Sequence, residues 1–407
     1  MLRSADCGTL RSENADDQVT LAGWIGRRRD HGGIIFLDLR DRSGIIQVVF
    51  NPEIASEATR IAEELRPEWV VQIKGTVNRR PDGSGNPAIA TGEVEVMASE
   101  VTVLNRSLTP PFYIDDEAEA EADESLRLRY RYLDLRRPPM LRNLTLRHNV
   151  VKYIRNFLND RDFLEIETPI LIKSTPEGAR DFLVPSRMQP GSFYALPQSP
   201  QQMKQLLMVA GVERYFQIAR CFRDEDLRAD RQLEFTQLDL EMSFVEEQDI
   251  LDLTEELYIG MMESVSPEKK LRKPFPRISH AEAMERYASD KPDLRFGLEM
   301  TDVSDLAKET EFRVFLSTVD GGGQIKGFVV PGQAQFVTGQ VKELEDTAKA
   351  AGAGGLVYIR YRGTNSVGQL MSEEILESAG LRMPPEWHQR LADKMGAGPG
   401  DMILLMA

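Results

Sequence analysis

The sequence predicts an α+β protein of several domains that opens with a small β-barrel, and three features indicate this class. Before residue 105, apolar and polar residues alternate in five short segments, and longer segments with helical spacing follow. The 407 residues exceed what one simple core needs, so two to four domains are expected. From about Phe296, short helical and extended segments alternate with many glycines, which is typical of a compact α+β domain.

The amino-acid composition argues against several classes of protein. Hydrophobic residues at 41% and charged residues at 28% are ordinary for a globular protein, and the net charge of −15 argues against a general nucleic-acid binder with a broadly basic surface. Local clusters of cations remain compatible with RNA binding. Cys7 and Cys221 have no CxxC spacing, so packing roles are expected rather than disulfide or zinc chemistry. The absence of a signal-peptide core and of a long apolar run predicts a cytoplasmic protein without membrane spans.

The first 105 residues predict a barrel. The expected strands are Val19–Ile25, Ile34–Leu39, Ile45–Phe50, Val70–Val77 and Glu93–Val103. Ile54–Leu65, between the third and fourth strands, has helical spacing, and five strands with a helix in that place form the OB-fold layout. Arg29, Phe36 and Gln47 would supply a cation, a stacking ring and an amide for single-stranded nucleic acid. Taken alone, Phe36 fits a buried core residue better than a stacking platform, since strand aromatics are usually buried.

Residues 106–139 predict a hinge. This stretch holds Pro110-Pro111, an acidic run from Asp115 to Glu124, and then the basic and aromatic segment RLRYRYLDLRRP. Two interpretations of its arginines stay open, namely contact with an RNA backbone and pairing with acidic neighbours.

The next segments alternate helix and strand. Met140–Leu158 has helical spacing and leads into FLEIETPIL, where Pro169 predicts an edge strand because proline cannot donate to a ladder. Residues 172–181 suit a mobile loop. In Phe193–Leu207 we expect a strand, a turn and a helix with Ser199 as N-cap, on which Gln201 and Lys204 share a face.

Phe216–Phe244 predicts two strands joined by a long charged loop. Hairpin connections usually take two to five residues, so the loop from Arg223 to Gln232 favours ligand binding. Arg223 offers a planar fork for phosphate, Glu225 an acceptor for an exocyclic amine, and Phe235 a ring face for a purine. The alternative is a surface hairpin laced with salt bridges.

The order of residues in this hairpin resembles a known family. Phe-Arg-Asp-Glu-Asp, a charged loop and then Glu-Phe-Thr-Gln-Leu-Asp are similar to motif 2 of the class II aminoacyl-tRNA synthetases, in particular the bacterial aspartyl enzymes. The resemblance extends over the whole chain. It implies an OB-fold anticodon-binding domain at 1–105, a hinge at 106–139, the first part of a class II antiparallel-sheet catalytic domain at 140–295 and an inserted α+β domain at 296–407.

The resemblance also implies a reaction and its residues. ATP would activate L-aspartate to aspartyl-adenylate, and the aspartyl group would pass to tRNA(Asp), with Arg223 as the catalytic residue on the α-phosphate and the substrate carboxylate. The aspartate site would comprise Glu177, Gln201, Lys204, Arg223 and Asp239. The ATP site would comprise Arg223, Asp224, Glu225, Gln232 and Phe235. Asp239 would hold Lys204 on the substrate's side-chain carboxylate and help to reject asparagine. Without the resemblance, Lys204 and Glu177 fit solvated surface residues.

The matching anticodon positions are Arg29, Phe36, Gln47 and Glu93. His31 and Gly83 resemble members of the family that charge both tRNA(Asp) and tRNA(Asn); the alternative is that both are ordinary loop residues, with Gly83 forming a turn in PDGSG. The helix and strand before residue 170 match motif 1, the family's dimer interface, which implies a C2 homodimer.

The chain departs from the family at its end. The family's later segment, with further ATP and magnesium ligands and motif 3, has no counterpart here, so we expect a fragment or a truncated reading frame. Mg²⁺ is expected with ATP, but no residue of this chain is assigned to a metal. Ile403–Met406 predicts a strand with nothing after it to cover it. The rival interpretations are an asparaginyl or lysyl relative and a non-catalytic or truncated paralogue that binds tRNA.

Overall fold

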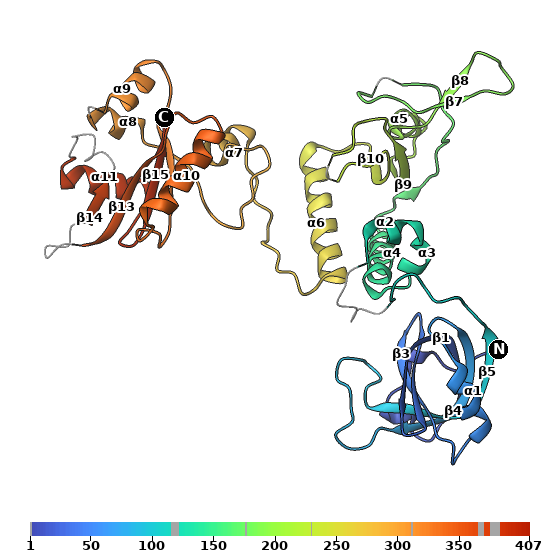
Figure 1. Ribbon diagram of the computed structural model, residues 1–407. Coiled ribbons are helices and arrows are strands. Elements are labelled where there is room, and N and C mark those ends of the chain that lie inside the picture. The colour runs from blue at the N-terminus through green and yellow to red at the C-terminus, as the bar shows by residue number, and fades with distance from the viewer. Residues whose placement is uncertain are drawn as a thin grey trace. The chain divides into compact units, whose positions relative to one another are not determined.

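The computed structural model describes residues 2–114, 122–175, 177–228, 230–310, 312–364, 370–374 and 383–407, with the backbone alone for 370–374. Two compact units, Met1–Leu271 and Arg272–Ala407, divide the chain (Figure 1). Each unit is described by itself below. The domain boundaries expected from the sequence stay predictions. No helix of the described residues has both the length and the apolar character that a bilayer span requires.

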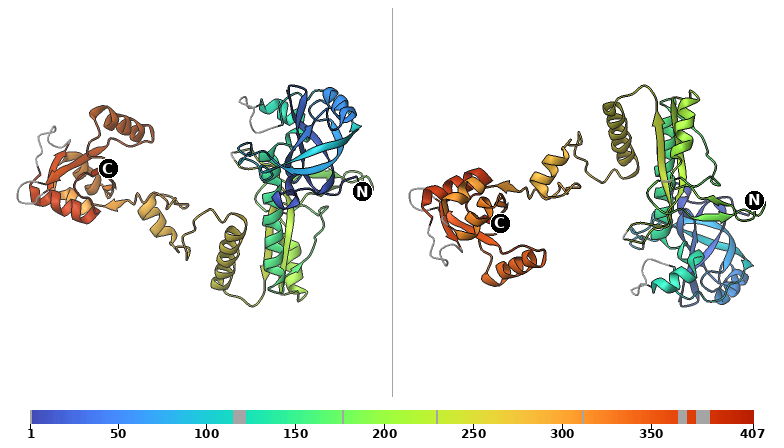
Figure 2. Two further views of the ribbon diagram at one scale, coloured as in Figure 1. Left: turned by 90° about the horizontal axis from the view of Figure 1, so that it is seen from below. Right: turned by 90° about the horizontal axis from the view of Figure 1, so that it is seen from above.

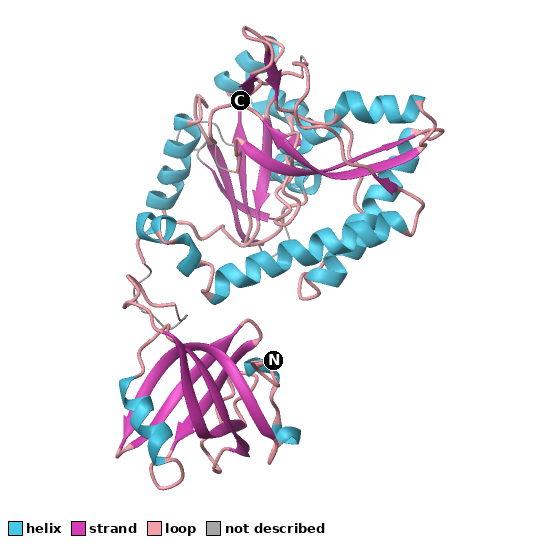
Figure 3. Ribbon diagram, turned by 90° about the vertical axis from the view of Figure 1, so that its right-hand side faces the viewer, coloured by secondary structure: helices cyan, strands magenta, loops and turns pink. Residues whose placement is uncertain are grey.

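A closed five-stranded barrel opens the first unit, in the order β1-β2-β3-β5-β4 (Figure 3). Its elements are β1 (Gln18–His31), β2 (Ile34–Asp41), β3 (Gly44–Phe50), α1 (Ser56–Glu64), β4 (Val70–Arg79) and β5 (Val94–Asn105). Alternate strand residues such as Leu37, Leu39 and Ile73 are fully buried inside it. Cys7 is buried against the barrel, and its N–H donates to Asp41 Oδ2 at 2.8 Å. The predicted OB-fold is confirmed.

The hinge arginines surround buried carboxylates. Two short helices, α2 (Glu124–Arg129) and α3 (Arg131–Asp134), follow the acidic run, most of which lies outside the described residues. Asp134 is fully buried, with Arg127 Nε at 3.0 Å, Arg137 Nη1 at 3.5 Å and Arg131 as a third partner. Of the two open interpretations of this basic segment, the structure therefore supports pairing with acidic neighbours.

A three-stranded sheet with helices on its back forms the rest of the first unit. Its elements are α4 (Pro138–Asn159), β6 (Leu164–Glu165), β7 (Leu183–Pro185), β8 (Phe193–Ala195), α5 (Gln201–Val209), β9 (Arg214–Phe222), β10 (Glu234–Met242) and α6 (Glu247–Val265). The sheet order is β10-β9-β6, with β9 and β10 antiparallel, and β7 pairs separately with β8. Because strand side chains alternate, Phe216, Leu238 and Leu240 share one face, where they pack with Phe157 of α4 and Leu257 of α6. The opposite face of the hairpin is polar.

Two local predictions in this unit were wrong. The strand expected in FLEIETPIL is only Leu164–Glu165 and ends before Pro169, because Thr168 instead bonds the Gln217 side chain at 3.0 Å. Helix α5 begins at Gln201 with Pro200 at the N-cap, so Ser199, the predicted N-cap, lies one residue before the observed one. Its hydroxyl has another partner, Glu177, described below.

The second unit is a five-stranded sheet with helices on both faces (Figures 1 and 2). Its strands are β11 (Thr301–Asp302), β12 (Lys326–Val330), β13 (Val357–Thr364), β14 (Leu370–Glu374) and β15 (Met402–Met406), in the order β11-β12-β15-β13-β14. Its helices are α7 (His280–Tyr287), α8 (Ser304–Ala307), α9 (Arg313–Asp320), α10 (Thr338–Ala350) and α11 (Pro385–Met395).

The expectation that the last strand is uncovered was wrong, since β15 is the central strand of this sheet. Ile403 packs with Trp387 on one face, whereas Leu404 packs with Val341 on the other. A continuous apolar run is typical of a strand buried on both faces. The helices that cover β15 precede it in the chain.

Candidate functional site

The polar face of the β9-β10 hairpin carries the candidate site. Side chains on this face are Tyr215, Gln217 and Cys221 from β9, and Gln237, Asp239 and Glu241 from β10. The register places Asp239 opposite Gln217 and Glu241 opposite Tyr215. Helix α5 contacts both strands of the hairpin.

Lys204 of α5 is held by two carboxylates of β10. Its Nζ lies 2.9 Å from Asp239 Oδ1 and 3.2 Å from Glu241 Oε2, and its side chain is 12% exposed. Burial acts to lower the pKa of Lys204, but the hydrogen bond and charge of Asp239, followed by those of Glu241, outweigh burial and raise that pKa. An ammonium has three protons to donate, so Lys204 can accept a third anionic partner while these two bonds remain.

Asp239 perturbs the groups around it. Burial, and then the negative charge of Asp239, raise the pKa of Cys221 to about 11, and the same two causes raise the pKa of Tyr215. Only one oxygen of this carboxylate is satisfied, because Asp239 Oδ2 is buried without a hydrogen-bond partner among the described residues. A buried acceptor of this kind is costly unless a ligand or water supplies a donor.

Arg223 brings a buried donor to the same face. It follows β9 directly, its guanidinium carbon lies 5.1 Å from the ring centroid of Phe235, and its Nε is buried without a hydrogen-bond partner among the described residues. The backbone N–H of Arg223 donates to the Leu233 carbonyl at 2.9 Å, which closes the base of the loop. A guanidinium with a buried, unsatisfied N–H suits an anion.

The charges that act on Cys221 place three predicted site residues around one thiol. Asp239 and Glu177 raise the pKa of this thiol and Arg223 lowers it, after the larger effect of burial. Contacts agree with this grouping, since Glu177 bonds Ser199 just before α5, Lys204 of α5 pairs with Asp239, and Arg223 lies over the Phe235 ring of the same hairpin.

Glu177 is fixed by hydroxyl groups on both sides. Its carboxylate accepts from Thr175 Oγ1 at 3.1 Å and from Ser199 Oγ at 2.6 Å. Ser199 lies just before α5, and its Oγ also accepts from the backbone N–H of Gln201 at 3.3 Å. The half-buried Gln201 is thus next to the site through its backbone.

Gln198 fastens the loop that carries Glu177. Its amide bonds both the N–H and the carbonyl of Ala179, and its Nε2 donates to Asp181 Oδ1 at 2.6 Å. The loop also reaches the hairpin, since the Asp224 N–H donates to the Arg180 carbonyl at 3.0 Å. The sequence reasoning missed the roles of Gln198 and Ser199; the hydroxyl and amide side chains that flank Pro197 and Pro200 were the available signal.

The tip of the hairpin loop stays apart from this cluster. Asp224, Glu225 and Gln232 are exposed. Glu225 lies 3.8 Å from the exposed Arg231, and this is its one ion pair recorded in the described chain. Within the described part of the loop, no hydrogen bond or ion pair joins Glu225 or Gln232 to Arg223.

The barrel gathers a second set of predicted residues on its outer surface. Arg29 Nη2 donates to Asp38 Oδ1 at 2.8 Å and to Gln47 Oε1 at 3.5 Å, and Gln47 Nε2 donates to Glu95 Oε2 at 2.8 Å. Phe36 is paired across the strands with Arg29 and is only partly buried, which favours the stacking interpretation over the core one.

The other residues predicted to contact tRNA are Glu93, His31 and Gly83, and they differ in their surroundings. Glu93 is exposed and accepts from Ser12 Oγ at 2.5 Å, so Glu95 and not Glu93 joins the Gln47 network. The His31 ring meets the edge of Phe36 with centroids 5.7 Å apart, so His31 extends the surface around that ring. Gly83 has φ +79° in an exposed turn, a conformation that favours glycine.

Across the described chain, no group of three or more His, Cys, Asp or Glu side chains has a metal-binding arrangement. Magnesium bound with a nucleotide usually takes one or two carboxylates and phosphate oxygens, and we assign no residue of this chain to that ion.

Comparisons with known proteins agree with this layout. The family of class II tRNA synthetases (D, K and N) matches residues 123–373, and the OB-fold nucleic acid binding domain matches residues 19–104. Two relatives named aspartate–tRNA(Asp/Asn) ligase, from Dehalococcoides mccartyi (strain CBDB1) and Rubrobacter xylanophilus, are each 54% identical over 408 residues. These matches include all of this chain but 68% and 66% of the relatives, respectively.

A solved structure shares the fold. The asparaginyl-tRNA synthetase from Pyrococcus horikoshii complexed with asparaginyl-adenylate has a TM-score of 0.62 and 22% identity, and the match covers 100% of this chain and 93% of that one. At this identity the likeness concerns the fold alone. From the family match, the full-chain relatives and the barrel with its adjoining hairpin sheet, we conclude that this protein belongs to the class II tRNA synthetases of the D, K and N group.

Proposed function

We propose that this protein is an aspartate–tRNA ligase, which activates L-aspartate with ATP and transfers the aspartyl group to tRNA(Asp). The observation that carries this proposal is the position of Lys204, held by Asp239 and Glu241 on the same hairpin face as the unsatisfied Arg223 Nε. An ammonium and a guanidinium in one polar region suit the two carboxylates of aspartate.

The three charged groups of aspartate have candidate partners. Lys204 binds the side-chain carboxylate, Arg223 the α-carboxylate, and Glu177 the α-amino group. Asp239 keeps Lys204 charged and in place. Asparagine presents a neutral amide to Lys204, so it loses the charge-assisted bond that aspartate makes.

The chemistry needs alignment more than covalent catalysis. The α-carboxylate oxygen attacks the α-phosphorus of ATP, pyrophosphate leaves, and a terminal ribose hydroxyl of the tRNA then attacks the aspartyl carbonyl and releases AMP. Arg223 stabilises negative charge that develops on the α-phosphate. Phe235 stacks on the adenine, and Asp224, Glu225 and Gln232 contact ATP when the loop closes on it.

Magnesium would accompany ATP, where it neutralises phosphate charge.

The barrel binds the anticodon through Arg29, Phe36 and Gln47. Arg29 supplies a cation, Phe36 a ring on which a base stacks, and Gln47 an amide for a base edge. We propose that both tRNA(Asp) and tRNA(Asn) are charged. The contact of His31 with Phe36 and the printed name of the relatives support this.

The protein acts in the cytoplasm as a homodimer in this proposal. Leu144 and Leu146, on the N-terminal half of α4, are 49% and 44% exposed, and a C2 partner would cover such apolar residues.

Charging assays test the function. The complete product of the gene, incubated with ATP, radiolabelled aspartate and tRNA(Asp), is expected to form alkali-labile aspartyl-tRNA, whereas asparagine and lysine are not incorporated. An absence of charging together with intact tRNA binding would instead indicate a binding paralogue that lacks adenylation.

A further inference from the structure

One buried carboxylate joins the barrel to the hinge. Glu68 lies in the turn before β4, is 6% exposed and has φ +66°. Its oxygens accept from Arg40 Nη2 of β2 at 2.8 and 3.0 Å, and its Oε2 also accepts from Arg136 Nη1 of the hinge at 2.7 Å. A carboxylate with two guanidinium partners satisfies several acceptor positions at once.

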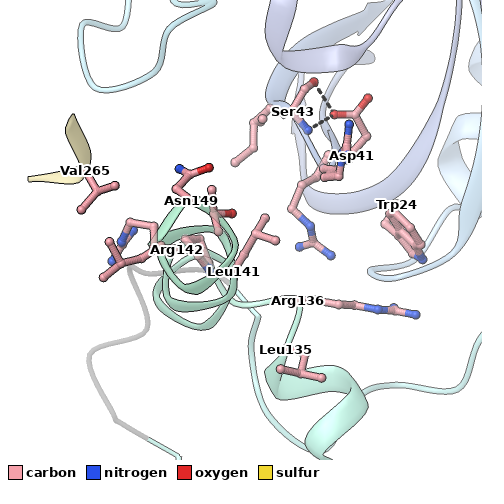
Figure 4. A pocket seen from close by; sticks show the side chains of 16 residues that line it. Trp24, Asp41, Ser43, Leu135, Arg136, Leu141, Arg142, Asn149 and Val265 are labelled. Atoms are coloured by element: carbon pink, nitrogen blue, oxygen red, sulfur yellow. Dashed lines mark hydrogen bonds between the residues drawn. The ribbon is translucent and has the colours of Figure 1, made fainter. Parts of the chain in front are cut away.

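Arg136 has a second contact with the barrel. Its guanidinium carbon lies 5.0 Å from the ring centroid of Trp24 on β1, and Figure 4 shows the two side chains on the same side of a cavity. Cation–π contacts of this kind add to an ion pair without competing for the same donors. Two strands and one turn of the barrel thus hold one hinge residue.

The same turn also holds the start of the hinge. Trp69 Nε1 donates to the Ser107 carbonyl at 3.0 Å, and the Arg106 guanidinium carbon lies 5.1 Å from the Trp69 ring centroid. Glu68 and Trp69 therefore fix both ends of the segment that connects barrel and sheet.

Cavities flank this group of contacts. One of about 630 Å³ is lined by Trp24, Arg40 and Arg136 among others (Figure 4). A second of about 330 Å³ is lined by Arg40 and Glu68 among others. Apolar packing is incomplete beside a cavity, so less dispersion energy stabilises this junction. The attachment consequently depends more on the contacts of Glu68, Trp24 and Trp69 with the hinge.

Arg136 lies between α3 and α4, the helix that packs behind the synthetase site. Its N–H donates to the Leu133 carbonyl at 3.0 Å, and the next residue, Arg137, pairs with the buried Asp134 before α4 begins at Pro138. The C-terminal half of α4 packs on the back of β9 and β10. A continuous series of contacts therefore runs from the barrel turn to the strands that carry Lys204's partner Asp239.

We propose that Glu68 and Arg136 are positioning residues, which hold the barrel so that a tRNA bound by its anticodon presents its terminal ribose to the site. This inference rests on the proposed function. Neither residue touches aspartate or ATP in this account, so adenylation does not depend on them. Transfer to tRNA does depend on them, because it needs both ends of one rigid substrate to be engaged together.

Glu68→Gln removes the charge and keeps the shape, and Arg136→Gln leaves the Glu68–Arg40 pair intact if the first variant folds poorly. Glu100→Gln is the matched control, since Glu100 is an exposed barrel residue paired with Lys74 at 2.7 Å. On the complete gene product, we expect kcat for charging to fall about tenfold in either test variant, while aspartate-dependent pyrophosphate exchange and the tRNA Kd change less than about twofold. Glu100→Gln should match wild type.

A tRNA(Asp) with an altered anticodon separates positioning from a general structural role. In the test variants, the altered anticodon should reduce the kcat of charging less than it does in wild type, because anticodon binding no longer positions the terminal ribose. The altered anticodon should weaken tRNA binding equally in the variants and in wild type. Wild-type kcat and anticodon dependence in both variants would overturn the inference, as would an equal loss of exchange and charging. Lack of aspartate-dependent exchange in wild type would instead refute the proposed function, and this inference with it.

Discussion

Lys204 Nζ lies 2.9 Å from Asp239 Oδ1, and the two side chains are only 12% and 10% exposed. This ion pair joins α5 to β10, which are far apart in the sequence. Desolvated pairs of this kind are strongly destabilising to break, because the remaining charge is left without a partner. The presence of such a buried ion pair here agrees with a binding role for the Lys204 ammonium.

Lys204→Ala should abolish aspartate-dependent pyrophosphate exchange and leave tRNA binding intact, because the barrel is separate from this pair. We also expect a loss of stability on the order of 3 kcal/mol from the uncompensated carboxylates. Exchange kinetics and urea unfolding measure the two effects. Lys349→Ala, at an exposed pair with Glu345, is the control and should match wild type. Unchanged exchange in Lys204→Ala would refute the role of Lys204.

Asp239→Asn should lower kcat/KM for aspartate about tenfold to a hundredfold, the effect of losing a charged hydrogen bond, and reduce the preference for aspartate over asparagine. Glu241→Gln should have a smaller effect, because Glu241 is 33% exposed and lies farther from Lys204, at 3.2 Å. Exchange assays with each amino acid give both ratios. A larger effect from Glu241→Gln would contradict the assignment of Asp239 as the main partner.

Cys221 should make stability fall at alkaline pH. Burial, and then the charge of Asp239, raise the pKa of this thiol in the folded protein to about 11 from an ordinary value of 9.0. Because the folded value is the higher one, this contribution is fully present below about pH 9 and is lost as pH rises to 11, by about 2 to 3 kcal/mol. Urea unfolding between pH 8 and 11 should show this loss in wild type and a correspondingly smaller loss in Cys221→Ala. Parallel pH profiles for the two proteins would contradict it.

Phe36→Ala should weaken tRNA binding about tenfold or more, because stacking contributes about 1 to 3 kcal/mol per base. Fluorescence anisotropy with a labelled anticodon stem-loop measures this Kd. Ile54→Ala is a suitable control, since Ile54 is an apolar barrel residue that is 63% exposed. If the two variants bind equally well, Phe36 is not a stacking platform.

His31 leads to a prediction about tRNA choice. Wild type should charge tRNA(Asp) and tRNA(Asn), and His31→Ala should change the ratio of the two rates, because it alters the surface beside Phe36. Charging assays with each purified tRNA give that ratio. If wild type does not charge tRNA(Asn), the proposal that it charges both tRNAs is wrong.

Strand alternation made much of this fold predictable. The five barrel strands and the β9-β10 hairpin have clear period-two patterns, and those patterns also separate the apolar back of the hairpin from its polar face. Roles that depend on tertiary contacts were not predictable. Ser199 has the residue type of an N-cap, but its proximity to Glu177 depends on how the loop folds back.

Other errors have similar causes. Glu93 lies in the turn just before β5, whereas Glu95 lies on β5 opposite Gln47, and the sequence alone does not show where the strand begins or how it is paired. The burial of β15 depends on pairing with β12 and β13, which are distant in sequence. The pairing of hinge arginines with Asp134 and Glu68 likewise requires knowledge of which carboxylates are buried.

A crystal structure of the complete gene product with a non-hydrolysable aspartyl-adenylate analogue tests the central claim most directly. We predict that the ligand's side-chain carboxylate lies within hydrogen-bond distance of Lys204 Nζ and that its phosphate mimic lies beside Arg223. An analogue bound away from the β9-β10 hairpin, or bound there with Lys204 still satisfied by Asp239 and Glu241 alone, would contradict the account.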